Sequence, residues 1–243
     1  MFKKIQIDSF FYFFMILSCL TASFKNFFFF LSIIVIHELG HVFMGLILGW
    51  ELDKICLYPY GGITRFNVDI NKRLIEEFLV LIGGSLFQII YFIIGYFLYN
   101  SNYFNYYNLS ILIFNLLPIY PLDGGRILNI IISYFFSFRK SFYLSIFLSV
   151  IISILFIYIL VINNYTFNVV FMFIIVISKV VIEYKKRNYY FNKFLMERYL
   201  NNYSFKKIKN ISSIKKMMRD HRHIIFNNNH YYTEKDFLKK LYR

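Results

Sequence analysis

Long apolar runs separated by short polar connections dominate the chain up to about residue 181. A helix crosses a bilayer core with about 20 consecutive apolar residues, and runs near that length recur along the sequence. We therefore expect an all-α polytopic membrane protein with six transmembrane helices. The predicted spans cover residues 8–24, 27–48, 78–99, 103–120, 142–162 and 167–181.

The composition agrees with this fold class. Of the 243 residues, 58% are hydrophobic and only 16% are charged, and the mean hydropathy is +0.54. Soluble domains carry more charge and less apolar surface than this. We therefore expect a six-helix membrane domain over residues 1–182, followed by a tail over residues 183–243.

The lysines and arginines predict the orientation, because cytoplasmic loops carry an excess of both. With the N-terminus inside, the predicted external connections contain one basic residue, Lys25. Both termini are therefore expected in the cytoplasm. Most of the formal net charge of +14 lies in the tail.

The basic tail allows two interpretations. Tyrosines interleaved with lysines occur in nucleic-acid-binding segments, but the tail contains no recognisable reader motif. Attraction to anionic lipid explains the charge without a further partner. We expect a contact with the lipid bilayer and no nucleic acid, and we interpret His221, His223 and His230 as solvated surface residues rather than metal ligands.

The run IIVIHELGHVFMG places His37, Glu38 and His41 inside the second predicted span. Ionisable residues within a span are costly and usually carry function. Positions i and i+4 share one helical face, so both imidazoles can hold one metal ion while Glu38 reaches the water to be activated. This is the arrangement of H-E-x-x-H metallopeptidases, with one Zn²⁺ per chain as the expected cofactor. The alternative, a chance match, would bury three costly groups without purpose.

A catalytic zinc needs a third protein ligand. The acids outside the motif lie at the start of the first span, in a loop or in the tail, with the exception of Asp123 in FNLLPIYPLDGGRIL. Pro118 and Pro121 disturb the helix there, which lets Asp123 point inward. The alternative is a surface aspartate where a helix ends at proline and glycine.

Two glycine-containing segments favour particular structures. CLYPYGGITRF predicts a β-hairpin around Gly61 and Gly62, whose free edge can accept a peptide as an added strand; an ordinary loop is the alternative. Gly45 and Gly49 form G-x-x-x-G, which favours tight packing within the helix bundle.

HELGH and N-x-x-P-x-x-P-L-D-G-G together resemble the site-2 protease family of intramembrane metalloproteases, over roughly residues 27–129. The resemblance implies that His37, His41 and Asp123 bind zinc and that Glu38 activates water. It further implies a hairpin that re-enters the membrane. Residues that position the substrate are implied at Asn115, Pro118 and Pro121.

The third predicted span contains LIGGSLFQII, which is similar to a Gly-Pro-containing element of that family. Ser85 stands where proline is usual, so a fixed kink is not expected. Gln88 is a candidate substrate contact, with an interhelical hydrogen bond as the alternative.

Within the family, the chain most resembles the proteases of sporulation. That resemblance implies a membrane-associated protein substrate, the sigma-factor precursor pro-sigma-K. It also implies inhibitory membrane proteins and a place on the mother-cell side of the outer forespore membrane. The tail shows little apolar periodicity and no recognisable CBS or PDZ domain, so we expect it to be partly helical.

The sequence leaves three other functions as alternatives. A related protease that trims an anti-sigma factor or a peptide pheromone would share the chemistry and differ in substrate. A catalytically silent scaffold is disfavoured by the intact ligand set. A metal transporter would show polar residues along several spans.

Overall fold

The computed structural model describes residues 5–7, 9, 12, 15–16, 20, 24–58, 61–162, 167–205, 207–227 and 230–242. They fall into two units. The first unit consists of Met1–Val68 and Phe78–Leu116, and the second of Asp69–Glu77 and Leu117–Arg243. Helix α3 (Leu74–Tyr99) begins in the second unit and continues into the first.

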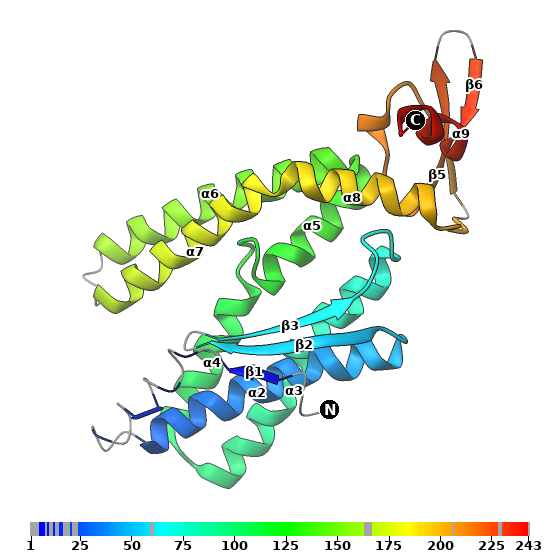
Figure 1. Ribbon diagram of the computed structural model, residues 1–243. Coiled ribbons are helices and arrows are strands. Elements are labelled where there is room, and N and C mark those ends of the chain that lie inside the picture. The colour runs from blue at the N-terminus through cyan, green and yellow to red at the C-terminus, as the bar shows by residue number, and fades with distance from the viewer. Residues whose placement is uncertain are drawn as a thin grey trace. The chain divides into compact units, whose positions relative to one another are not determined.

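A helix and a β-hairpin form the centre of the first unit (Figure 1). Strand β1 (Ile5–Ile7) pairs in parallel with β2 (Glu51–Tyr58), which pairs antiparallel with β3 (Gly61–Asn67). The predicted hairpin is therefore confirmed, with β3 at the edge of the sheet order β1-β2-β3. The unit also contains α2 (Phe24–Ile47) and α4 (Asn102–Leu116).

Helix α2 packs against the hairpin through its glycine and valine positions. Val42 forms a buried cluster with Leu52 and Ile55, and Phe66 packs against that cluster. A Cβ on Gly45 would lie 2.5 Å from the Phe66 ring, so glycine is needed for this contact.

The prediction that Gly45 and Gly49 pack helix against helix is wrong. Gly45 faces the strand residue Phe66. Gly49 has φ of 72° and follows the last turn of α2, where the Trp50 N–H donates to the Gly45 carbonyl at 2.8 Å. This is a left-handed glycine cap, which ends a helix and satisfies its last carbonyls.

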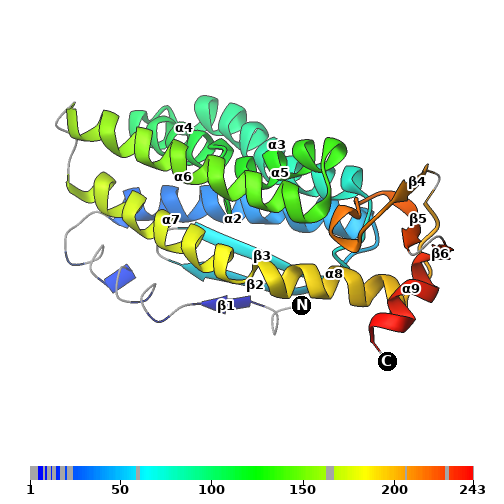
Figure 2. The same ribbon diagram turned by 90° about the horizontal axis from the view of Figure 1, so that it is seen from above.

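The second unit contains helices followed by a small sheet. Its helices are α5 (Asp123–Phe135), α6 (Phe138–Ile162), α7 (Phe167–Lys185), α8 (Arg187–Leu200) and α9 (Glu234–Leu241). Helices α6 and α7 run side by side (Figure 2). Its strands are β4 (Lys207–Ile211), β5 (His221–Asn227) and β6 (His230–Thr233), with a short 3₁₀ turn at Ile214–Lys216.

A line of buried serines runs along α6. Each hydroxyl donates to a carbonyl of its own helix: Ser145 to Ser141, Ser149 to Ser145 and Ser153 to Ser149, all at 2.7 Å. The Ser149 oxygen also accepts the backbone N–H of Tyr120 at 2.7 Å. The small serine side chains therefore leave this face of α6 narrow, and their hydroxyl groups all have hydrogen-bond acceptors within the helix.

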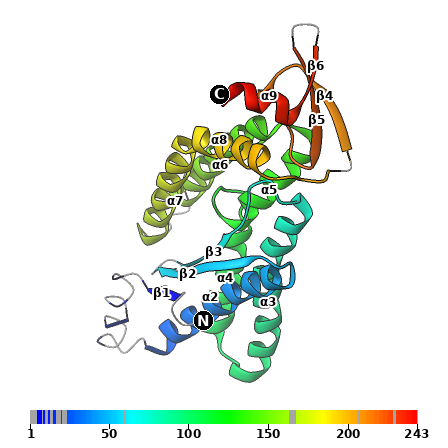
Figure 3. The same cartoon turned by 45° about the vertical axis from the view of Figure 1, so that its right-hand side comes forward.

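The tail of the chain packs into a core together with the first residue of α6, Phe138. Strand β4 pairs in parallel with β5, and β5 pairs antiparallel with β6, while α9 packs on this sheet (Figure 3). The core is a cluster of buried apolar side chains: Phe138, Phe194, Leu195, Ile211, Met217, Ile225 and Leu238. The sequence of the tail does not indicate this packing, because its apolar residues show little periodicity.

The prediction that His223 is a solvated surface residue is wrong, because its side chain is only 1% exposed. Its Nδ1 donates to Glu234 Oε1 at 2.6 Å, and its Nε2 accepts the Met218 N–H at 3.1 Å. Because each ring nitrogen has one role in hydrogen bonding, the imidazole is neutral.

This burial predicts a pH dependence of stability. Burial, partly offset by Glu234, lowers the pKa of His223 below its ordinary value of 6.5. As pH falls through that value, the unfolded chain binds a proton that the folded ring resists, so the second unit loses stability. We expect residues 187–243 to become protease-sensitive after a milder heat pulse at about pH 5.5 than at about pH 7.5, with digestion at one common pH. His223→Asn, which does not titrate, should show a smaller difference; an equal difference would contradict the assignment.

The described residues are mostly helical and include two small three-stranded sheets, so the fold is not all-α. Among the described residues, three helices are long and apolar enough to cross a membrane: Phe24–Ile47, Leu74–Tyr99 and Phe138–Ile159. Most of the predicted span 8–24 lies outside the described residues. The predicted span 103–120 extends too far, because α4 ends at Leu116, two residues before Pro118.

Candidate metal centre

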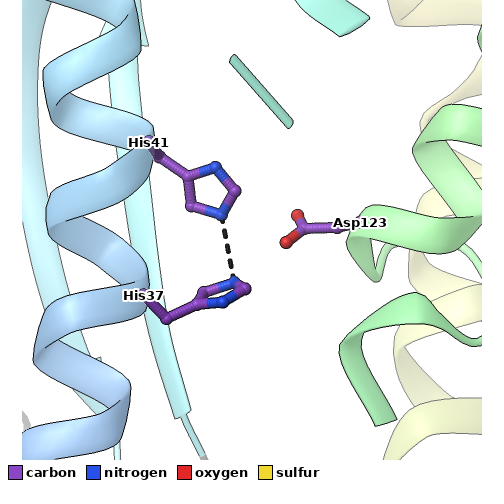
Figure 4. A group of neighbouring side chains, drawn as sticks. All are labelled: His37, His41 and Asp123. Atoms are coloured by element: carbon purple, nitrogen blue, oxygen red, sulfur yellow. Dashed lines mark hydrogen bonds between the residues drawn. The ribbon is translucent and has the colours of Figure 1, made fainter. Parts of the chain in front are cut away.

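The two motif histidines lie on one face of α2, as their spacing predicts. His37 and His41 are 3% and 7% exposed, and their Nε2 atoms are 3.2 Å apart (Figure 4). They lie in an apolar stretch of α2, FFFFLSIIVIHELGHVFMGLI, and both side chains are buried.

Hydrogen bonds at the opposite ring nitrogens define both tautomers. His41 Nδ1 lies 2.8 Å from the Val80 carbonyl, which only accepts, so Nδ1 carries the proton. His37 Nδ1 lies 2.9 Å from Gln88 Oε1. The Gln88 amide nitrogen donates to the carbonyl of Asn108 at 3.0 Å, which identifies the Gln88 oxygen as the atom facing His37. In the neutral rings, both Nε2 atoms therefore present lone pairs.

This donor set fits zinc. Two nitrogens bonded to one tetrahedral zinc at about 2.0–2.1 Å lie roughly 3.3 Å apart, close to the 3.2 Å between His37 and His41 Nε2. Two facing lone pairs repel each other, and a shared cation removes that repulsion. Outer hydrogen bonds from Nδ1 to oxygen are the usual support of zinc-binding histidines.

Gly84 leaves space beside the Nε2 atoms of the two histidines. A Cβ on Gly84 would lie 2.5 Å from His41 Nε2 and 3.0 Å from His37 Nε2. The backbone of α3 comes this close to α2 because Gly40 and Gly83 also lack side chains: a Cβ on Gly40 would lie 2.3 Å from the Gly83 carbonyl oxygen. Because α2 and α3 pack closely, the backbone of α3 at Gly83 and Gly84, which carries no side chains, lies next to the histidines.

Glu38 is 5% exposed and faces the hairpin. The Thr64 hydroxyl donates to Glu38 Oε2 at 2.7 Å. A Cβ on Gly62 would lie 2.7 Å from Glu38 Oε1, so the backbone of β3 can lie this close to the carboxylate only because residue 62 is glycine. The hairpin thus orients the carboxylate by Thr64 and gives it room at Gly62.

Of the other predicted site residues, Asn115 and Gln88 lie with His37 in the first unit. The Asn115 amide nitrogen is 3.3 Å from His37 Nε2. Gln88 is 0% exposed, and both ends of its amide are hydrogen-bonded. Gly61 lies at the start of β3 with φ of 150°, and a Cβ there would meet no described atom within 4 Å.

The remaining predicted residues belong to the second unit. Asp123 is the first residue of α5 and projects from its N-terminal turn (Figure 4). Pro118 and Pro121 lie in the connection between α4 and α5. That connection folds closely over the helix, since a Cβ on Gly125 would lie 2.3 Å from the Ile119 carbonyl carbon.

Thr64, Val80 and Asn108 contact the predicted site residues and were not among the predictions from the sequence. Alternation along a strand would have placed Thr64 on the same face as Gly62. No sequence pattern indicates that Val80 contributes its carbonyl or that Asn108 holds Gln88, because these contacts depend on how α3 lies against α2 and α4.

Comparisons with known proteins agree with this site. The model of peptidase family M50 matches residues 26–105 and 101–159. The chain is 32% identical to stage IV sporulation protein FB of Bacillus subtilis over 205 residues, which are 81% of this chain and 71% of that protein.

Two further proteins are similar, one over part of the chain and one over most of it. A zinc metalloprotease of Methanocaldococcus jannaschii is 36% identical over 121 residues, 44% of this chain and 34% of that protein. The solved site-2 protease from Methanocaldococcus jannaschii superposes with a TM-score of 0.53 at 23% identity, covering 84% of this chain and 94% of that one. This likeness shows a shared fold.

Proposed function

The chain belongs to peptidase family M50 as an intramembrane zinc metalloprotease of the site-2 type, and from this we propose that it removes the pro-sequence of a sporulation sigma-factor precursor, pro-sigma-K. The similarity to stage IV sporulation protein FB over 81% of the chain is the observation that carries the proposed substrate. The pair of imidazoles in α2 supports the chemistry.

We assign the zinc to His37, His41 and Asp123. Two imidazoles and one carboxylate form a common ligand set of catalytic zinc, and they keep one position open. When bound, zinc supplies Lewis acidity toward water and a peptide carbonyl.

Glu38 acts as the general base and acid in this proposal. It takes a proton from the attacking water and delivers it to the departing amine. The hydroxyl of Thr64 holds one carboxylate oxygen at 2.7 Å, and Gly62 has no side chain that would clash with the other oxygen, which is the one proposed to transfer the proton.

A peptide must be extended to expose its carbonyls, since a helix uses them in its own hydrogen bonds. The outer edge of β3 can take such a segment as an added strand, which brings it past Gly61 and Gly62 toward Glu38. Asn115, Pro118 and Pro121 are proposed to position the substrate near the metal. Gln88, buried and bonded at both ends, is proposed to hold His37 instead of contacting substrate.

The proposed topology keeps the six predicted transmembrane helices, with the hairpin re-entering the membrane and both termini in the cytoplasm. Residues 1–182 form the protease domain and residues 183–243 a basic cytoplasmic domain. In a sporulating cell the enzyme would lie in the outer forespore membrane, with its site toward the mother cell and inhibitory membrane proteins as partners.

Co-expression with tagged pro-sigma-K tests this function. The wild-type chain is expected to shorten the precursor and to purify with one zinc, whereas Asp123→Asn should lose most of both, because a neutral amide is a poor zinc ligand. Gln88→Leu should weaken zinc binding by about tenfold or more.

The outcomes separate the parts of the proposal. Zinc in the wild type without cleavage of pro-sigma-K would move the substrate to another membrane protein, such as an anti-sigma factor or a pheromone precursor. Full zinc affinity in Asp123→Asn would remove Asp123 from the ligand set. A wild type without zinc would refute the metal site.

A further inference from the structure

Strand β3 carries one charged side chain, Arg65, next to the residues that contact Glu38. The Thr64 hydroxyl donates to Glu38 of α2, and the Phe66 ring also faces α2. Arg65 lies between these two positions, and successive side chains of a strand point to opposite faces of the sheet. The Arg65 side chain therefore points away from α2, and the residue is exposed.

The guanidinium of Arg65 is not paired with an acid. Among the described residues it forms no ion pair, and the two acids of β2, Glu51 and Asp53, do not contact it. Its opposite residue on β2 is Lys54, whose Nζ donates to Gln6 of β1 at 3.1 Å. Like charges directly opposite each other in a sheet are destabilising. The sheet therefore does not compensate the charge of Arg65.

Strand β3 lies at the edge of its sheet, so an added strand would lie directly beside Arg65. The sheet order is β1-β2-β3, and both hairpin strands run alongside α2 (Figure 1). Adjacent strands are about 4.8 Å apart, and opposite residues have Cβ atoms about 4.5–5.5 Å apart. An aspartate or glutamate opposite Arg65 would therefore lie within reach of an ion pair with the guanidinium.

The position of this acid relative to Glu38 follows from the geometry of the strand. Gly62 lies against the Glu38 carboxylate, and Arg65 is three residues further along β3. At about 3.3 Å per residue, the acid would lie roughly 10 Å from the residue opposite Gly62. Because three is an odd separation, its side chain would point away from Glu38. An acid on the inner face would instead meet the Glu38 carboxylate, and like charges repel.

We propose that Arg65 is a specificity-determining residue of the protease. It selects an extended segment that carries an aspartate or glutamate three positions from the residue opposite Gly62. Attraction at Arg65 and repulsion at Glu38 both favour this arrangement, and selective sites commonly use both. The acid lies on the C-terminal side of the cleaved bond if the segment adds parallel to β3, and on the N-terminal side if it adds antiparallel. This inference rests on the proposed cleavage of a segment added to β3.

A scan of tagged pro-sigma-K tests the inference with the full-length protease. Each position around the cleavage site is made glutamate in one variant and glutamine in another. The ratio of the two kcat/KM values isolates the effect of charge, because glutamine has nearly the shape of glutamate. Low ionic strength is used, since salt screens exposed charges. We expect the wild type to favour glutamate at one position by about threefold, the scale of an opposite-charge pair across two strands.

Substitutions in the protease identify the residue responsible. Arg65→Gln should cleave the glutamate and glutamine variants equally at that position, and Arg65→Glu should favour lysine over glutamine there. Lys54→Gln is the matched control. It removes a cation from the same face, but β3 separates Lys54 from an added strand. The preference for glutamate should therefore persist in Lys54→Gln.

An unchanged preference in Arg65→Gln, or no preference at any position in the wild type, would overturn the inference and leave the proposed function intact. An equal loss of rate on all substrate variants in Arg65→Gln would also overturn it, because a contact of Arg65 with anionic lipid would have that effect. If Arg65→Gln does not accumulate, Arg65→Glu decides: glutamate still favoured there would refute the role of Arg65. A wild type that cleaves no variant would overturn the proposed substrate, and the inference with it.

Discussion

Replacing Gly84 with alanine is expected to abolish zinc binding and, with it, proteolysis. The added methyl carbon would lie 2.5 Å from His41 Nε2 and 3.0 Å from His37 Nε2, where the metal is expected. The imidazoles have little room to retreat, because His41 is bonded to Val80 and the two backbones are in contact at Gly40 and Gly83. Zinc per chain, measured on purified protein by mass spectrometry of the metal, should fall to background.

The neighbouring Ser85 supplies the control for this substitution. It is 6% exposed, and its hydroxyl has no hydrogen-bond partner among the described residues, so Ser85→Ala removes an atom without adding volume. That variant should retain zinc, and both variants should show the helical circular dichroism of the wild type. Normal zinc content in Gly84→Ala would show that the metal does not lie between these imidazoles.

Glu38→Gln is expected to separate metal binding from catalysis. Glutamine has the shape of glutamate and its oxygen can still accept the Thr64 hydroxyl, but it takes up no proton at neutral pH. Loss of a general base costs about 10²–10⁴ in rate. Cleavage of a tagged substrate should therefore fall by that factor at unchanged zinc content.

Two further variants test the expected loss of rate in Glu38→Gln. Thr64→Val keeps the carboxylate and removes its hydrogen-bond donor, so the loss of rate should be smaller than in Glu38→Gln. Asp53→Asn neutralises an exposed acid on the same hairpin and should leave the rate unchanged. Loss of zinc in Glu38→Gln would mean that Glu38 is a ligand and not the base.

The sequence predicted the parts of the site that depend on local geometry. The H-E-x-x-H spacing alone indicates that two imidazoles share a helical face, and the structure confirms it at 3.2 Å between Nε2 atoms. The hairpin followed from glycines between β-prone runs. The contacts of Val80 and Asn108, and the hydrogen bond that Asp220 accepts from the Leu74 N–H, could not be predicted from the sequence. Each contact joins residues from different elements and depends on how those elements lie against each other.

The tail shows how local patterns can mislead. Its strands are short: lysines flank the first isoleucine of KIKNI, and two histidines and an arginine precede the three apolar residues of HRHIIFN. Too few apolar positions occur in sequence for a periodic signal, yet Ile211, Ile225 and Leu238 meet in one cluster once the strands pair. His223 was misjudged for the same reason, since its burial follows from that pairing.

The serines of α6 bear on how this protein is made. Because Ser145, Ser149 and Ser153 return their hydroxyls to carbonyls of their own helix, none of them needs an acceptor on a neighbouring helix when α6 leaves the translocon. A helix with internally satisfied polar groups can reside in lipid alone, and helices that insert separately assemble afterwards. The Ser149 oxygen can then accept a hydrogen bond from the Tyr120 N–H when the connection before Asp123 packs against α6. Biogenesis can thus place α6 in the bilayer first and dock the connection between α4 and α5 on it later.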